Sequence, residues 1–413
     1  MEIFITIFYC IFFTWLVIYT KFFVASGLGK WFLAGLFIIK LLAAFAYGIY
    51  FSQPAALATS DSWNYFQLSK GETDWLLQDP LAFIKDIFTS GYHHSSNLFL
   101  QGNSYWNDLK SNVIIKLMAI CNLFTFKNYY ANAVLLNYIY FFGPMAVYRV
   151  FSPTIQKNIP AAIAVFCIPS FLFWCSGAHK DGLIFTCIGL IIYFFYTQLK
   201  NRKIYYVHAI YMLILLIIIF ALRNFLAFLL LPALLVWVLS DFYPKKKWLI
   251  IFAIYGTGIV LFFVTGFLKE ANNFPEYIVK KQTEFKVLGG GSQIDLPALQ
   301  PNALSYVKFL PYAIDVSFLR PHFSEGKNVA AIFSTIELCV LWLIVILALF
   351  RWRKNPAFNS SFFVFCCCFS ISVLLLCGFT VTLSGAITRY RSIVLPLIIT
   401  PFLLGLFLKK GEI

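Results

Sequence analysis

Long apolar runs with almost no charge constrain this chain more than any other feature. A bilayer core about 30 Å thick is crossed by roughly 20 apolar residues in a helix. With 61% hydrophobic and 12% charged residues, the composition excludes a water-soluble core. We therefore predict an all-α integral membrane helical bundle of about eleven transmembrane helices. The predicted spans are 3–20, 31–51, 129–150, 159–178, 182–199, 204–222, 224–240, 248–268, 329–350, 360–383 and 392–408.

The charges of the connecting loops predict one orientation of these spans. If the loop between the first two spans is cytoplasmic, the inner side holds 15 basic and two acidic residues, and the outer side 16 basic and 14 acidic. This asymmetry follows the positive-inside rule and predicts an external N-terminus and a cytoplasmic C-terminus. The net charge of +15 is thus a topology signal and a contact with anionic lipid rather than with nucleic acid. The basic clusters are KNRK at 200–203, PKKK at 244–247 and RWRK at 351–354.

Two long polar segments interrupt the apolar array, and this topology makes both external: 52–128 and 269–328. We predict short helices at 62–70 and 75–88 in the first loop. The stretch 112–126 is too short for a span and contains Lys116, so we predict an interfacial amphipathic helix there. No flexible linker divides the chain, which indicates one integral membrane domain over 1–413. The N-terminal apolar run lacks a basic flank and a cleavage site and is expected to be a retained helix.

Several chemistries are not supported by any motif. Most of the 10 cysteines lie inside apolar segments as small buried hydrophobes, without the spacing of a metal site. The sequence contains no P-loop, no dinucleotide fingerprint, no HExxH and no CxxC. We therefore expect neither a metal nor a cofactor, and neither ATP-driven transport nor zinc proteolysis.

Asp61 is the first candidate for catalysis. It lies about ten residues after the second predicted span, where a carboxylate can act as general base toward an acceptor hydroxyl or amine. A helix cap by Ser60 or Asp61 would give the same local pattern. The other carboxylates of this loop are expected at the solvated surface: Asp74, Asp79, Asp86 and Asp108.

A second candidate site lies between the fourth and fifth spans, in PSFLFWCSGAHKDGL at 169–183. His179, Lys180 and Asp181 fall in a tight turn, where three different ionisable groups can bind a phosphate or pass a proton. A plain hairpin turn with a capping Asp181 is the structural alternative. Arg223 stands alone in apolar sequence on the external side, and intramembrane charges of this kind often meet an anion or a cavity.

A third group of basic residues precedes the last spans. Arg320 and His322 come before the ninth span, and Arg389 and Arg391 before the last. Arginine forks match phosphate oxygens bidentately, so these residues are candidates for a phosphorylated headgroup, with contacts to bulk lipid as the alternative. Lys40 and Glu337 are charged residues inside spans, and the sequence does not show whether they meet.

Asp61, in SDSWNYFQLSK, is an acidic residue in the first external loop, and an amphipathic helix follows it in the same loop. This pattern resembles that of the glycosyltransferase C superfamily. Its members are polytopic enzymes that take sugars from polyprenyl-phosphate carriers, and they include a protein-mannosyltransferase-like branch. PSFLFWCSGAHKDGL and SGAITRYRSIVLP are also similar to stretches of bacterial membrane proteins described as glycosyltransferases or polysaccharide polymerases. The resemblance spans most of the chain in architecture, although its motifs are short.

This resemblance implies a bacterial inner-membrane enzyme with a periplasmic N-terminus and a polyprenyl-phosphate-linked sugar as donor. Asp61 would be the catalytic base, and the carrier phosphate would be bound by basic residues at the outer face. The candidates for that contact are Lys180, Arg223, Arg320, Arg389 and Arg391. The superfamily often shows two adjacent acidic residues, whereas Ser62 follows Asp61 here. Either Asp74 or Asp108 supplies the second carboxylate, or the family is a different one.

Three other functions stay open on the sequence. An O-antigen-type polymerase or ligase, using undecaprenyl-diphosphate-linked oligosaccharide, would depend on Arg320, His322, Arg389 and Arg391 more than on Asp61. A lipid or polysaccharide transporter would need charges along a path across the membrane, where Lys40 and Glu337 are the main ones. A purely structural subunit would not need two large polar loops. The sugar, the acceptor and the oligomeric state are not given by the sequence.

Overall fold

A computed structural model of the chain describes residues 2–57, 60–87, 105–152, 158–268, 273–289, 292–325, 329–350 and 360–407. Across these residues the chain is almost entirely helical, and its extended pairing is an isolated bridge between Gln293 and Leu383. The predicted all-α class is therefore confirmed. The side chain of Asp108, the cluster at 351–354 and the basic residues Lys157, Lys409 and Lys410 lie outside the described residues.

Eight helices of the described chain have the length and apolar composition to cross a membrane. Two further pairs of helices are bent by 56° and 65° at a short break, and if each pair forms one span, the number rises to ten. The multi-pass helical architecture is thus as predicted, and the total of eleven stays a prediction. The eight are α1 (Glu2–Tyr19), α3 (Lys30–Ser52), α8 (Tyr129–Phe151), α11 (Lys180–Asn201), α12 (Tyr206–Phe242), α13 (Lys247–Val264, with flanking turns), α16 (Val329–Phe350) and α17 (Ser361–Thr380).

The bent pairs lie where the sequence suggests simple spans. The predicted span 159–178 is divided into α9 (Asn158–Phe166) and α10 (Pro169–Ser176), because Pro169 cannot continue a helix and instead occupies the first position of the next one. At the C-terminal end, α18 (Ser384–Ser392) and α19 (Leu395–Phe407) form the second pair. The charged SGAITRYR segment therefore lies in a helix of its own rather than in a loop.

The predicted spans 204–222 and 224–240 are continuous in α12, which has a break in its helical geometry at Arg223 (φ −152°, ψ 84°). A straight helix of 37 residues would be roughly 55 Å long, far more than a bilayer core needs. Each arm on either side of Arg223 is close to one span in length. If both bent pairs are spans, the number of crossings made by α12 decides whether the described part of the chain has ten or eleven.

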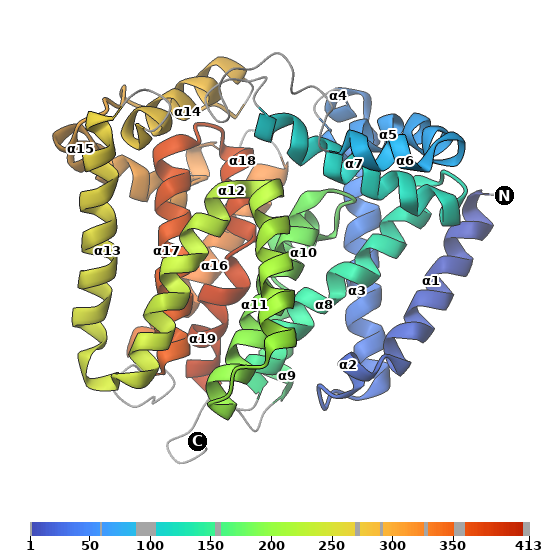
Figure 1. Ribbon diagram of the computed structural model, residues 1–413, viewed down its shortest axis with the longest axis horizontal. Coiled ribbons are helices and arrows are strands. Elements are labelled where there is room, and N and C mark those ends of the chain that lie inside the picture. The colour runs from blue at the N-terminus through green and yellow to red at the C-terminus, as the bar shows by residue number, and fades with distance from the viewer. Residues whose placement is uncertain are drawn as a thin grey trace. The chain divides into compact units, whose positions relative to one another are not determined.

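The chain divides into two compact units, Met1–Phe225 and Leu226–Ile413. In the first unit α1, α3, α8 and α11 pack together, and α5 (Asp61–Gln78), α6 (Pro80–Asp86) and α7 (Tyr105–Thr125) lie at one end of them (Figure 1). The helices α8 and α11 approach closely, since a Cβ at Gly189 would come within 2.4 Å of the Gly143 carbonyl oxygen. Small residues at such a crossing let two backbones meet.

The polar end of the first unit differs from its sequence prediction in two details. The predicted helices 62–70 and 75–88 are replaced by an unbroken α5 through Gly71 and a break at Asp79, whose side chain accepts a hydrogen bond from the Ala82 N–H at 3.0 Å. Pro80 then starts α6, which explains the position of the break.

The predicted helix 112–126 belongs to the longer α7, which is not among the candidate spans. Its Lys116 is buried, with ion pairs to Glu72 at 2.5 Å and Asp86 at 2.9 Å, and its ammonium lies over the rings of Trp75 and Phe83. This lysine therefore joins α5, α6 and α7.

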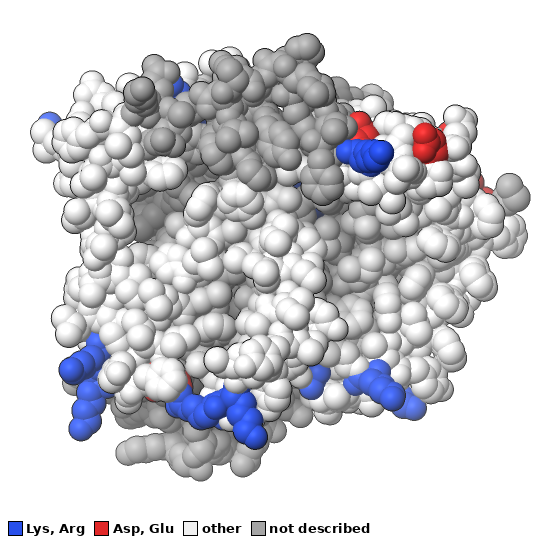
Figure 2. Space-filling model, viewed as in Figure 1, with Lys and Arg blue, Asp and Glu red and all other residues white. Residues whose placement is uncertain are grey.

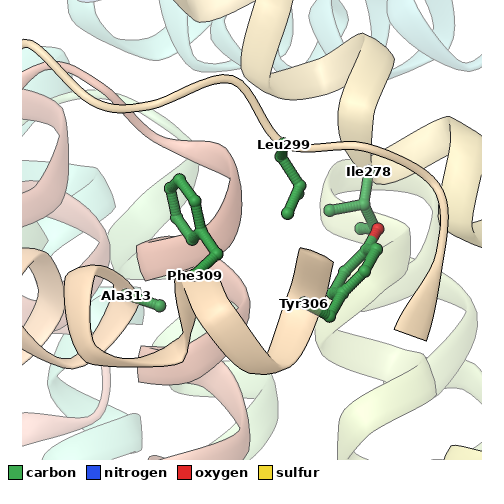
Figure 3. Packing of buried hydrophobic residues seen from close by; sticks show 5 residues of the cluster. All are labelled: Ile278, Leu299, Tyr306, Phe309 and Ala313. Atoms are coloured by element: carbon green, nitrogen blue, oxygen red, sulfur yellow. The ribbon is translucent and has the colours of Figure 1, made fainter. Parts of the chain in front are cut away.

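In the second unit, α14 (Phe274–Leu288) and α15 (Ala303–Ile314) lie at one end of the long helices (Figure 1). They are joined by a buried apolar cluster, in which Ile278 of α14 meets Tyr306, Phe309 and Ala313 of α15 and Leu299 of the connecting segment (Figure 3). The ring of Phe309 also packs against Phe379 of α17. Within this unit, α14 and α15 are thus attached to α17, which is long enough to span a membrane.

The surface of the long helices is apolar. Large hydrophobic side chains are exposed along α1, α13 and α16, and the candidate span that contains α13 buries none of its residues. On the face shown in Figure 2, charged side chains lie near the ends of the long helices and the surface between them is uncharged. Such a belt is expected of a protein whose solvent is lipid.

Candidate functional site

The turn between α10 and α11 brings the predicted residues His179, Lys180 and Asp181 into the interior of the first unit. All three are buried, with exposed fractions of 0%, 8% and 0%. Two glycines make the turn possible: a Cβ at Gly177 would lie 2.7 Å from the His179 ring, and one at Gly182 would lie 2.6 Å from the Cys175 carbonyl oxygen. The turn is therefore a packed polar element and not an exposed hairpin.

His179 caps the first turn of α11. Its Nδ1 accepts a hydrogen bond from the backbone N–H of Asp181 at 3.2 Å, while its own carbonyl oxygen accepts one from the Tyr140 hydroxyl at 2.9 Å. An accepting Nδ1 carries no proton, so the ring is neutral and its 3.4 Å contact with Asp181 Oδ2 is not an ion pair. The sequence suggests Asp181 as the capping residue of this helix, but the N-cap of α11 is His179.

Asp181 pairs with Arg223. The Arg223 Nη2 and Asp181 Oδ1 atoms are 2.5 Å apart, and both side chains are at least nine-tenths buried. The break of α12 at Arg223 places this guanidinium against the first turn of α11. Of the predicted residues, the structure therefore brings together His179, Lys180, Asp181 and Arg223.

Lys40 belongs to the same group, although it is not among the site residues predicted from the sequence. Its side chain is 1% exposed in the middle of α3, and Nζ donates to the Cys175 carbonyl oxygen at 2.9 Å and to Ser176 Oγ at 3.1 Å. The Asn137 amide donates to the Ser176 carbonyl oxygen at 2.7 Å. A lone lysine in an apolar helix indicates that a polar partner exists. The partners here, Cys175 O and Ser176 Oγ, lie 135 and 136 positions away in the sequence, so no local pattern identifies them.

Asp61 is the first residue of α5, and the cap of this helix is Ser60, whose Oγ accepts from the Trp63 N–H at 3.3 Å. Asp61 is half-buried. Its neighbour Ser62 is fully buried and donates to the Ala178 carbonyl oxygen at 2.9 Å, and it bonds the Tyr129 hydroxyl at 2.7 Å. The helix that carries Asp61 is therefore attached directly to the turn that carries His179.

The first turn of α5 is held by aromatic contacts as well. The ring of Trp63 stacks on Tyr129 with centroids 3.9 Å apart and planes 8° from parallel, and its indole N–H donates to the Gly48 carbonyl oxygen at 3.0 Å. These contacts fix the position of the Asp61 backbone relative to α3 and α8.

The remaining predicted residues form a second cluster, in the second unit. Arg320 pairs through Nε with Asp315 and through Nη1 with Glu325, each at 2.7 Å. His322 Nε2 lies 2.9 Å from the other oxygen of Asp315. Asp315 and Glu325 are absent from the predicted site; an acid five residues on either side of an arginine gives no specific sequence signal.

Arg391 supports this second cluster through the backbone. It is buried, and its Nη1 donates to the carbonyl oxygens of Arg320 at 2.8 Å and Ser317 at 3.4 Å. Arg389, on the same short helix, is half-buried. The phosphate contact predicted for these two arginines stays a prediction.

The two clusters differ in their balance of charge. Around the 175–181 turn and the start of α5, three cations, Lys40, Lys180 and Arg223, are buried, together with the buried carboxylate Asp181 and the half-buried Asp61. In the second cluster Arg320 already meets two carboxylates. Because an excess of buried positive charge is unfavourable unless an anion compensates it, the first cluster is the better anion site.

Among the described residues, no group of three or more His, Cys, Asp and Glu side chains is arranged to hold a metal ion. Comparison of the chain with protein-family models, with curated proteins and with solved structures finds no match in any of the three.

Proposed function

We propose that this protein is a membrane glycosyltransferase that transfers a sugar from a polyprenyl-phosphate carrier to an acceptor at the external face of the membrane. The observation that carries the proposal is the excess of buried cations around the 175–181 turn, joined by Ser62 to the helix that starts with Asp61. The buried cations can bind a phosphate, and the Asp61 carboxylate can activate an acceptor. The chemistry implied by the glycosyltransferase C resemblance is of the same kind.

In this mechanism Asp61 accepts the proton of the acceptor hydroxyl as the acceptor oxygen attacks the anomeric carbon. The bond between that carbon and the phosphate oxygen breaks, and its electron pair stays on the carrier phosphate. Lys180 and Arg223 stabilise the charge that develops there. Asp181 holds the Arg223 guanidinium in place through their ion pair, and His179 orders the start of α11.

The proposal includes the orientation predicted from loop charges. The chain would span the inner membrane of a bacterium eleven times, with α12 crossing twice, a periplasmic N-terminus and a cytoplasmic C-terminus. The polar helices α5, α6 and α7 and the helices α14 and α15 would then all be periplasmic. Support comes from the excess of basic residues in the loops assigned to the cytoplasm.

A transfer assay with purified protein tests the proposal. Polyprenyl-phosphate-linked and polyprenyl-diphosphate-linked sugars are offered as donors to the parent protein and to Asp61→Asn. We expect transfer from a monophosphate donor and a loss of roughly 100-fold or more in the variant, since general-base catalysis contributes about that much. Asp74→Asn is the matched control, because Asp74 lies on the same helix in an exposed pair with Lys127. Equal activity of all three proteins would refute Asp61 as the base.

The cluster in the second unit favours one other candidate, an O-antigen-type polymerase or ligase that uses diphosphate-linked oligosaccharide. Its supporting observation is that Arg320 and His322 meet on Asp315, with Arg391 bonded to the Arg320 carbonyl oxygen. This function predicts chain extension that survives Asp61→Asn and is lost in Arg320→Ala. An absence of transfer from every donor would direct attention to transport.

A further inference from the structure

The ammonium group of Lys40 has capacity for one more hydrogen bond. It carries three N–H donors, of which Cys175 O and Ser176 Oγ take two. Both acceptors are neutral, and within the described part of the chain Lys40 forms no ion pair. A buried ammonium solvated by neutral groups alone keeps a strong attraction for an anion.

The surroundings of Lys40 are the ends of two helices. Cys175 and Ser176 lie at the end of α10, and α11 begins at Lys180, four residues later. The ion pair of Asp181 with Arg223 lies at the start of α11. Lys40 therefore contributes its charge to the same turn as the residues proposed to hold the carrier phosphate.

The charge of this site can be followed through the proposed reaction. Before transfer, the turn and the start of α5 carry three cations, Lys40, Lys180 and Arg223, and two carboxylates, Asp181 and Asp61. With His179 neutral, this leaves one net positive charge beside a donor phosphodiester of charge −1. During transfer Asp61 takes the acceptor proton and becomes neutral, while the phosphate gains the electron pair of the broken bond. The site then carries +2 beside a phosphate monoester of charge −2.

We propose that Lys40 is a further phosphate-binding residue of this site, whose charge balances the phosphodiester that enters and attracts the dianionic polyprenyl phosphate that leaves more strongly, because the dianion carries twice the charge. This inference rests on the proposed function. It assigns Lys40 a contact that strengthens as the reaction proceeds, which is the kind of contact that accelerates a chemical step. Without Lys40, both the entering phosphodiester and the leaving phosphate would meet one positive charge too few.

The test compares three ligands on purified protein in detergent at pH 8, where a phosphate monoester is a dianion. The ligands are a polyprenyl phosphate, its methyl phosphodiester and the uncharged polyprenol. The parent protein is expected to bind the monoester more tightly than the diester. Lys40→Gln keeps N–H donors toward Cys175 and Ser176 but removes the charge. We expect it to weaken monoester binding by roughly 10- to 100-fold, diester binding less, and polyprenol binding not at all.

Two variants and a stability measurement accompany this comparison. Lys40→Arg keeps the charge and is expected to retain the preference for the monoester. Lys70→Met, on α5 of the same unit, is expected to bind all three ligands like the parent. Thermal unfolding of each protein shows whether it is folded, and a variant that binds polyprenol normally has kept its lipid site.

The outcomes separate the inference from the proposed function. If the parent binds polyprenyl phosphate but Lys40→Gln keeps the full preference for the monoester, Lys40 does not bind the phosphate and the inference is overturned. An equal loss of all three ligands in Lys40→Gln would overturn it too, since this indicates a structural role. If the parent binds neither phosphorylated ligand, the proposed function itself fails.

Discussion

Asp181 is a carboxylate with no exposed surface, whereas the other buried charged side chains of the described residues are lysines and arginines. Its desolvation is offset by Arg223 and by the hydrogen-bonded start of α11. A buried charge that loses its partner costs far more than the pair contributes when intact. Asp181 is therefore important for folding whatever reaction the site performs.

Replacement of this carboxylate should destabilise the protein strongly. Asp181→Asn leaves the buried Arg223 guanidinium without the carboxylate that it pairs with, and we expect a loss of about 3–5 kcal/mol in the free energy of unfolding. Thermal unfolding in detergent measures this as a large fall in Tm. Asp74→Asn removes a carboxylate from the exposed pair with Lys127 and should cost less than about 1 kcal/mol. Similar Tm values for both variants would contradict the role of Asp181.

The sequence indicates which residue types form the site but not how they pair. His179, Lys180 and Asp181 are recognisable because three ionisable groups share one turn between apolar runs, and Arg223 because it stands alone among them. Their pairing joins residues 42 positions apart, and it depends on a break in α12 that no proline or glycine marks at Arg223. Local patterns cannot specify such a contact, since it is decided by how the helices pack.

The helices α8 and α11 can cross closely because both have a glycine at the contact, Gly143 and Gly189. A Cβ at Gly189 would meet the carbonyl oxygen of Gly143 at 2.4 Å and its Cα at 3.1 Å, and both are backbone atoms that cannot turn away. The helix α11 begins with the site residues, so any separation of the two helices would also move the 175–181 turn. The crossing therefore links the packing of the bundle to the geometry of the site.

Gly189→Ala should weaken the protein although alanine favours helices. The added methyl forces the two backbones apart, at a cost of about 1–3 kcal/mol, which exceeds the gain of up to about 1 kcal/mol in helix propensity. Gly35→Ala on α3 is the matched control, because a Cβ there meets nothing within 4 Å, and it should leave the protein equally or more stable. The difference in Tm between the two variants is the measurement; a Gly189→Ala protein as stable as Gly35→Ala would show that the helices are not in close contact.

The length of the apolar runs predicts the helices well, and single proline and glycine residues account for the differences. The spans 3–20, 31–51 and 129–150 coincide with α1, α3 and α8 to within one residue at each end, because a run of that length has few alternatives. The division at Pro169 and the continuity of α5 through Gly71 depend on single residues. From the sequence alone, a single span is predicted across Pro169 and a break between two helices is predicted near Gly71. Packing tolerates the glycine, whereas the missing N–H of Pro169 ends α9.

At the scale of the whole molecule, α12 decides the topology. If α12 crosses the membrane twice, the KNRK segment at 200–203 and the PKKK segment at 244–247 lie on the same side, as the positive-inside rule favours. If α12 crosses once, they lie on opposite sides, and every later loop is inverted. The helix length of 37 residues and its break at Arg223 both favour two crossings.

Reporter fusions at three positions distinguish these topologies. Green fluorescent protein joined after Lys203 and after Lys247 should fluoresce in both fusions, because this reporter folds in the cytoplasm. Alkaline phosphatase joined after Asn224 should be active, since this enzyme requires the periplasm. With a single crossing, only one of the two fluorescent fusions would give a signal, and Arg223 would lie within the bilayer. In that case Asp61 and Arg223 could not both face the periplasm, and the proposed carrier site would have to be abandoned.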